Sequence, residues 1–345
     1  MADQSRPDAW VQIVLKGGAF ERGLQHGRQL ADHIRPRVDR LWQAARADRP
    51  EIRRSIEMTR ELLASDLPDV YEEIRGIAEG AGLAAERVFL YNNRDLLGFK
   101  VADDCSHLCL FADGQVVVGM NKDMPTPLMD MYVLRKAYPS DGFASIGYAH
   151  VGRVWGYGMN ARGLCTASTA VYPLHVDAKQ PAVGLYHLPH LVLSTCESVG
   201  EAVERILSIE NLSGGGNLLL ADASGRSAVM ELSPRQRVVR EAEDGVLFST
   251  NFFASGQIEH ADRPEWLQES RERFDTLSSI LTETTNTGVN AAAAALKAHR
   301  RNGSVCRHNV RGIDTVLSFL AFPQKGEFWL CKGFPCRSTY QKYEL

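Results

Sequence analysis

The chain has 345 residues, of which 44% are hydrophobic and 23% are charged, as is typical of a globular protein with a sizeable core. The net charge of -3 and the pI near 6.4 exclude the basic footprint of nucleic-acid and polybasic membrane binders, so we expect small-molecule partners. Neither an export signal nor an apolar run long enough to span a bilayer is evident, which predicts a cytoplasmic protein. Seven cysteines, an odd number, favour reduced thiols over a disulfide framework.

The first part of the chain, residues 1–104, is expected to be mainly helical. Charged residues there are mixed with apolar residues at helical spacing. In the stretch 70–83 the apolar residues recur on one helical face, and Gly80 and Gly82 then follow as a helix stop. These features predict amphipathic helices.

From Cys105 onward the pattern changes to short strands. Segments 108–111 and 116–120 flank Asp113-Gly114, a typical two-residue hairpin turn, so a β-hairpin should open at Cys105. Further short strands, expected to be antiparallel, are predicted at 144–150, 154–159, 163–170, 217–221, 228–232, 246–249, 315–322 and 327–332. Helices are expected at 188–209, 265–281 and 290–299. The predicted fold class is α+β.

The predicted hairpin brings polar groups to the thiol of Cys105. Antiparallel pairing returns Asn121 and Asp123 to the start of the first strand. An internal cysteine needs an external base, whereas a chain-terminal cysteine carries an α-amine with a pKa of about 7.7 to 8. Breakage of the Asp104-Cys105 bond would therefore create a nucleophile with its own base, and Asp123 would support the charged amine.

Short motifs occur in a fixed order along the chain: EEIRGIAEGAGL (72–83) with NNR (92–94), DCS (104–106) with MNKD (120–123), STNFF (249–253), and SVCRH (304–308) with GFPC (333–336). Over roughly residues 15–345 this set resembles the acyl-CoA:isopenicillin N acyltransferase family of the N-terminal nucleophile (Ntn) hydrolases. The resemblance implies a four-layer αββα sandwich with two stacked antiparallel sheets. It also implies autocatalytic cleavage into an α fragment 1–104 and a β fragment 105–345, which stay together as one folded unit. The implied activity is hydrolysis or formation of a small-molecule amide through a thioester.

The resemblance also implies roles for individual residues. Cys105 would be the nucleophile of both self-cleavage and catalysis, and Asp123 the acidic partner of its amine and thiol. Asn251 would donate to the oxyanion, and Arg307 is the candidate for an arginine near the carboxylate or substrate. The implied partners are a small acyl amide and an acyl-CoA donor. Asp104 stands where many relatives have glycine, and it could either help protonate the departing amine or repel the thiolate.

Two more polar residues of the hairpin are candidates for the pocket. His107 should share the strand face of Cys105, where it could assist the thiol or could simply pack against the sheet. Asn121 should share the face of Asp123, where it could line the pocket or bond within the core. Phe252 stands where a histidine is common in the family, so a role for that histidine does not transfer.

No metal centre or cofactor is predicted. Three pairs combine metal-ligand residue types at short spacing: Cys331-x4-Cys336, Cys306-Arg-His308 and His187-x2-His190. None has the spacing of a zinc motif, so a structural or incidental role is expected for them. The glycine clusters lack the context of a nucleotide-binding loop.

Two other functions would use the same residues differently. A chain that keeps the scaffold without cleavage would be a binding protein, a hypothesis that Asp104 motivates. A thiol hydrolase without self-cleavage could instead use internal Cys105 with His107 or His150 as its base. An intact chain with activity would favour this last hypothesis.

Overall fold

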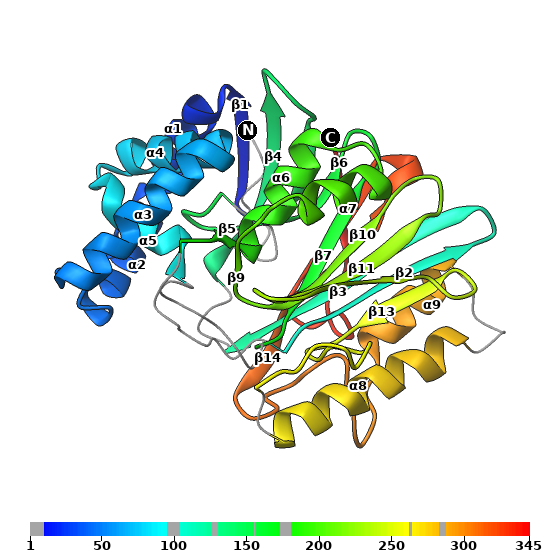
Figure 1. Ribbon diagram of the computed structural model, residues 1–345. Coiled ribbons are helices and arrows are strands. Elements are labelled where there is room, and N and C mark those ends of the chain that lie inside the picture. The colour runs from blue at the N-terminus through cyan, green and yellow to red at the C-terminus, as the bar shows by residue number, and fades with distance from the viewer. Residues whose placement is uncertain are drawn as a thin grey trace.

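Two β-sheets lie face to face in this computed structural model, and helices cover their outer faces (Figure 1). The structure describes residues 10–94, 104–125, 130–154, 156–172, 181–261, 264–282 and 288–345. The predicted α+β class and the predicted αββα order of layers are confirmed. Cleavage into two fragments is a separate prediction that the arrangement of layers does not address.

The N-terminal part of the chain forms one strand and five helices in the described region. They are β1 (Gln12–Gly17), α1 (Ala19–Gln29), α2 (Ala31–Ala44), α3 (Pro50–Asp66), α4 (Pro68–Ala81) and α5 (Ala85–Asn92). Strand β1 was not predicted, and it pairs parallel with β4 (Tyr132–Pro139), so the expectation of purely antiparallel sheets needs correction at this edge. Gly82 ends α4 with a φ of 66°, as its position after the apolar pattern predicted.

Helices α1 and α4 pack at backbone contact through paired glycines. Gly23 and Gly27 of α1 face Gly76 and Gly80 of α4. A Cβ atom at Gly23 would lie only 2.0 Å from the carbonyl oxygen of Glu73. The close approach therefore depends on the absence of side chains, and it fixes where Glu73 enters the core.

The first sheet has eight strands in the order β1-β4-β5-β6-β7-β10-β11-β12. Its remaining strands are β5 (Ser145–His150), β6 (Gly156–Asn160), β7 (Cys165–Ala170), β10 (Gly216–Ala221), β11 (Ser227–Leu232) and β12 (Arg237–Glu241). A separate short pair consists of β8 (Val183–Gly184) and β9 (Leu212–Ser213). Helices α6 (Leu188–Thr195) and α7 (Val199–Leu207) contact this sheet.

The second sheet has six strands in the order β13-β2-β3-β14-β15-β16. They are β2 (Ser106–Ala112), β3 (Gln115–Pro125), β13 (Val246–Ser249), β14 (Ile313–Phe322), β15 (Glu327–Lys332) and β16 (Gln341–Glu344). Helices α8 (Pro264–Thr282) and α9 (Gly288–Lys297) cover its outer face (Figure 1). The largest hydrophobic cluster of the described residues includes the core between the two sheets and continues under the N-terminal helices and under α6 and α7.

The predicted hairpin is confirmed in position and register. Asp113 and Gly114 form its turn with φ values of 53° and 72°, the left-handed backbone that this turn requires. Ser106 lies opposite Asn121, so the end of β3 returns to the beginning of β2 as predicted. The prediction of a single helix at 188–209 is wrong, because a break at 196–198 separates α6 from α7.

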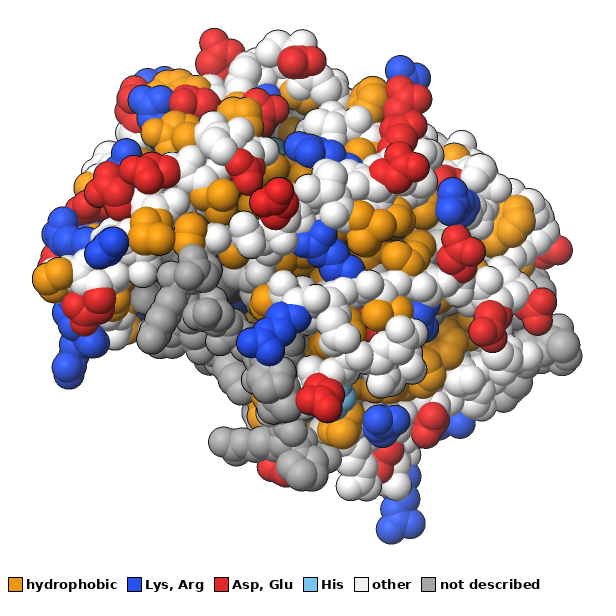
Figure 2. All heavy atoms as spheres, in the orientation of Figure 1, with side chains coloured by type: hydrophobic (Ala, Val, Ile, Leu, Met, Phe, Trp, Pro, Cys, Tyr) orange, Lys and Arg blue, Asp and Glu red, His pale blue; other side chains and the backbone are white. Residues whose placement is uncertain are grey.

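The surface carries charges of both signs. Figure 2 shows acidic and basic side chains interspersed over the visible face, with neither sign gathered into one continuous patch. This distribution agrees with the small net charge of -3. Among the described residues, no helix combines the length and apolar character needed to cross a membrane.

Candidate active site

Cys105 directly precedes β2 and is fully buried. Because side chains alternate along a strand, Cys105, His107 and Cys109 share the side of β2 that faces the eight-stranded sheet. Cys105 and Cys109 accordingly belong to the core between the sheets, whereas Leu108 and Leu110 pack in the cluster that contains α9. The thiol therefore points toward the inside of the sandwich.

Tyr148 of β5 approaches this side of the hairpin from the other sheet. Its hydroxyl group donates to the sulfur of Met120 at 3.5 Å. Burial raises the pKa of Tyr148 well above its usual value; Lys122 opposes this effect, and Cys105 adds to it. A phenol and an ammonium group thus lie on the thiol side of the hairpin.

The peptide bond before Cys105 is contacted by a buried arginine of α8. Nη1 of Arg273 donates to the carbonyl oxygen of Asp104 at 2.8 Å and to that of Cys105 at 3.0 Å. The same nitrogen reaches Oγ of Ser106 at 3.2 Å. An arginine that is 1% exposed therefore polarises the carbonyl group directly before Cys105.

Arg273 was missed by the sequence analysis. Its neighbours Arg271 and Glu272 make this stretch of α8 resemble a solvated, charged surface. One feature of the sequence could have predicted its burial. Arg273 precedes Leu277 and Leu281, both of which are buried, by four and eight residues. That spacing puts Arg273 on the buried face of the helix.

The carboxylate of Asp104 is held by two arginines. One oxygen lies 3.2 Å from Nη2 of Arg307, and the other lies 3.6 Å from Nη2 of Arg273. Arg307 also pairs with Glu269 of α8 at 3.3 Å. Asp104 is thus ion-paired in the uncleaved chain, and its backbone N–H donates to the carbonyl of Asp123 at 3.3 Å.

Asp123 lies deep in the same site. Thr315 of β14 donates its hydroxyl hydrogen to one carboxylate oxygen of Asp123 at 2.6 Å, and the other oxygen has no hydrogen-bond partner among the described residues. Burial raises the pKa of Asp123 to about 7, although Arg307, Arg273 and the Thr315 hydrogen bond each oppose that rise. The carboxyl group therefore titrates near neutral pH in the uncleaved chain.

The two asparagines are used differently. Oδ1 of Asn251 accepts from Arg273 at 3.0 Å, and its Nδ2 donates one hydrogen to the carbonyl of Ala170 at 2.8 Å. Asn121 donates to the carbonyls of Leu296 and Val305 at 2.8 and 3.0 Å. Asn251 therefore belongs to the Arg273 cluster, whereas Asn121 fastens α9 and the following loop to β3.

The two histidines proposed as bases, His107 and His150, are both buried. His107 is fully buried, both of its ring nitrogens are without hydrogen-bond partners there, and burial together with Arg240 lowers its pKa to about 3. His150 lies 3.3 Å from the hydroxyl group of Tyr91, and burial lowers its pKa well below the usual value. Both imidazoles are therefore neutral at pH 7.

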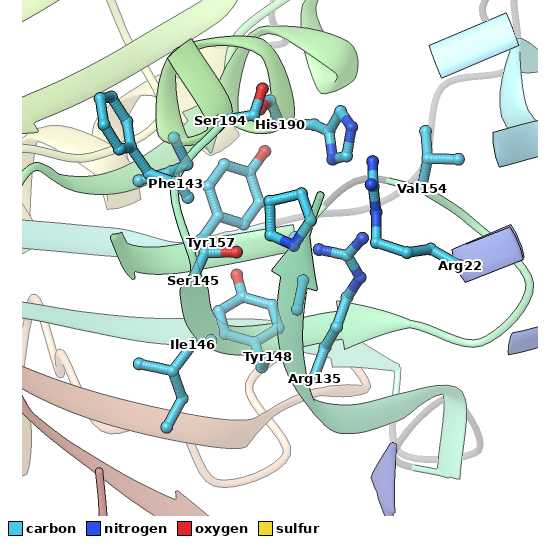
Figure 3. Close-up of a pocket in the computed structure, with 15 residues that line it drawn as sticks. Arg22, Arg135, Phe143, Ser145, Ile146, Tyr148, Val154, Tyr157, His190 and Ser194 are labelled. Carbon is cyan, nitrogen blue, oxygen red and sulfur yellow. The ribbon is translucent and has the colours of Figure 1, made fainter. Parts of the chain in front are cut away.

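A second buried charged cluster joins the N-terminal helices to the eight-stranded sheet. Figure 3 shows Arg22, Arg135 and His190 converging at the cavity they line. Glu73 accepts from Arg135 at 2.7 Å and from Arg22 at 3.3 Å. Burial alone would raise the pKa of Glu73, but Arg135 and the neighbouring basic groups lower it to about 2. His190 is neutral at pH 7, because burial lowers its pKa to about 4.

Residues 110–336, about two thirds of the chain, match the family model described as acyl-coenzyme A:6-aminopenicillanic acid acyl-transferase. The matched segment contains Asp123, Asn251, Arg273 and Arg307, and it begins five residues after Cys105.

Two solved structures are also similar. Penicillin V acylase from Agrobacterium tumefaciens aligns with 15% identity and a TM-score of 0.40, over 66% of this chain and 82% of that one. A variant of conjugated bile acid hydrolase from Clostridium perfringens aligns with 14% identity and a TM-score of 0.41, over 70% of this chain and 97% of that one. At these values neither likeness bears on activity, so the family match carries the assignment.

Proposed function

The chain belongs to the acyl-coenzyme A:6-aminopenicillanic acid acyl-transferase family, and from this premise we propose that it is a self-cleaving amide hydrolase or acyltransferase with Cys105 as its nucleophile. The observation that supports this most is the contact of Arg273 with the carbonyl oxygen of Asp104 at 2.8 Å. A buried cation on that oxygen has an obvious chemical use if the adjacent thiol attacks the carbonyl carbon. The contact therefore supports the proposal independently of the family match, because membership of the family does not by itself require it.

Self-cleavage would proceed in two steps. The sulfur of Cys105 attacks the carbonyl carbon of Asp104 as the thiol gives up its proton, and Arg273 stabilises the oxyanion. The C–N bond then breaks, and the leaving nitrogen takes up the proton that the thiol lost. The product is a thioester with a free α-amine on Cys105. Water then hydrolyses the thioester, which leaves a carboxylate on Asp104 and a thiol on Cys105.

The new amine would then act as the base in catalysis. With a pKa of about 7.7 to 8 it can accept the thiol proton at neutral pH. The unpartnered oxygen of Asp123 lies on the strand next to the cleaved bond, where it can accept from the resulting ammonium group. Asn251, whose Oδ1 accepts from Arg273, would donate from its side-chain amide to the substrate oxyanion.

The substrate would be a small acyl amide. Attack by the thiolate gives an acyl thioester and releases an amine, which takes its proton from the ammonium group. Water resolves the thioester in a hydrolase, and an acceptor amine resolves it in an acyltransferase. The family description names an acyl-coenzyme A, so a CoA thioester is the acyl donor we would test beside simple amides.

The alternatives have weaker support. A thiol hydrolase without cleavage needs a base beside Cys105, and His107 is a buried neutral imidazole whose ring nitrogens make no hydrogen bond within the described part of the chain. A binding protein that never cleaves would leave the Arg273 contact without a chemical purpose. The pairing of Asp104 with two arginines also removes the repulsion of the thiolate that motivated this hypothesis.

Intact-mass analysis of freshly purified protein tests the proposal. Cleavage before Cys105 should divide the 38.2 kDa chain into fragments of about 11.5 and 26.7 kDa, in proportion to 104 and 241 residues. The Cys105→Ala chain should stay whole. The Cys109→Ala chain, which alters a cysteine four residues further along the same strand face, should still be cleaved. An uncleaved wild-type chain with amidase activity would refute self-cleavage and favour the internal-thiol hypothesis.

A further inference from the structure

Four potential metal ligands gather beside the candidate site. His299, Cys306, His308 and Cys336 place one ligand atom each within 4.8 Å of all the others. They come from the loop after α9, the segment before β14, and the segment between β15 and β16. Their spacing along the chain gives no zinc signature, which is why the sequence predicted no metal here.

The distances between these atoms fit the edges of a tetrahedron around zinc. Zinc bonds of about 2.3 Å to sulfur and 2.0 to 2.1 Å to nitrogen imply edges of about 3.8 Å between two sulfurs and 3.6 Å between sulfur and nitrogen. The two sulfurs of Cys306 and Cys336 are 3.6 Å apart. Nε2 of His308 lies 3.5 Å from the first sulfur and 3.2 Å from the second.

The surroundings hold these ligands in place. The ring of His308 stacks on Phe334 with centroids 3.9 Å apart and an interplanar angle of 14°. The backbone N–H of Cys306 donates to the carbonyl of Ala298 at 3.1 Å, which ties the ligand loop to the end of α9. Two thiolates would balance the charge of a divalent cation, and two imidazoles would complete its coordination.

We propose that His299, Cys306, His308 and Cys336 bind a structural Zn²⁺ ion. With four protein ligands the site is closed, so the ion would organise the chain and leave no position for a substrate. Arg307 stands between two of the ligands and pairs with Asp104 at 3.2 Å. The ion would therefore fix the loop that carries Arg307, and it would tie the segment before β16 to that loop.

Zinc content provides the test. We expect elemental analysis of protein purified without an affinity metal to find about one zinc per chain, and Co²⁺ in its place to give the visible absorption of a tetrahedral thiolate site. Cys336→Ser should lose the metal. Cys196→Ser, which alters a cysteine far from the cluster, should keep it.

An exposed ligand provides a variant that should still fold. His299 is exposed, so His299→Asn should keep the native circular dichroism and weaken zinc binding at least about tenfold in competition with a chromophoric chelator. The proposal is overturned if reduced wild-type protein neither contains nor takes up zinc. It is also overturned if protein purified without oxidant has a Cys306–Cys336 disulfide, or if folded His299→Asn binds zinc as tightly as wild type. All these readouts are independent of self-cleavage.

Discussion

Removal of Arg273 should slow self-cleavage by two to three orders of magnitude. Its guanidinium group contacts the Asp104 carbonyl oxygen at 2.8 Å, at the position where charge develops when the thiol attacks. The loss of one such donor typically costs about 2.7 to 4 kcal/mol in the transition state, which corresponds to a rate lowered about 10²- to 10³-fold. We therefore expect Arg273→Met to be purified largely as the uncleaved chain.

The assay is a time course of intact mass at fixed pH, in which the fraction of the 38.2 kDa chain is followed. Arg271→Met is the matched control, because Arg271 is exposed on the same helix and stacks over Phe252 at 4.8 Å. Arg273→Lys keeps the charge but loses the planar fork, so its rate should lie between those of wild type and Arg273→Met. A folded Arg273→Met chain that cleaves at the wild-type rate would refute this role of the arginine.

Three further perturbations test the electrostatics and packing around the site. The pKa of Asp123 rises from 3.8 to about 7 on folding, so the folded chain holds an extra proton between these values and its unfolding free energy should fall by about 3 kcal/mol as pH rises from 4 to 7. In a chain whose self-cleavage is blocked, Asp123→Asn should weaken this fall in unfolding free energy, as measured by urea titration at each pH. An unchanged pH dependence would contradict the raised pKa of Asp123. Gly23→Ala should lower the unfolding free energy by about 1 to 3 kcal/mol, because its Cβ would lie 2.0 Å from a backbone oxygen. Gly200→Ala is the control: its Cβ meets only the end of a flexible side chain, so the unfolding free energy should hardly change. Equal melting temperatures for the two alanine variants would rule out the close helix contact. Glu73→Gln should lower the unfolding free energy by about 3 to 5 kcal/mol, because it leaves two buried arginines without a carboxylate. Glu72→Gln, at the partly exposed neighbour, should lower it by less than about 1 kcal/mol, and similar urea midpoints for the two variants would count against the buried cluster.

The hairpin was predictable because its determinants are local. Asp113-Gly114 specifies the turn, and the turn specifies the register that brings Asp123 back to the start of β2. The split between α6 and α7 was missed because apolar spacing continues across it. The local signal for the break is Ser198, which begins a new helix: its side chain caps the N-terminus of α7 by accepting from the backbone N–H of Glu201 at 3.3 Å.

Contacts between distant segments were not predictable in the same way. Arg273 meets Asp104 across 169 residues, and nothing near either residue indicates the other. The edge strands β1 and β12 were missed because they carry polar residues and depend on neighbours for their pairing. The cluster of His299 and Cys336 likewise exists only once β14 and β15 have brought its segments together.

In the mature protein, Cys105 should carry both an α-amine and a thiol. A cyanobenzothiazole probe forms a stable ring only with a residue that has both groups, so it distinguishes Cys105 from the six other cysteines. We predict one adduct on the fragment of about 26.7 kDa, mapped to the peptide that begins at Cys105, and none in Cys105→Ala. A wild-type chain that stays at 38.2 kDa and forms no adduct after denaturation would contradict the claim.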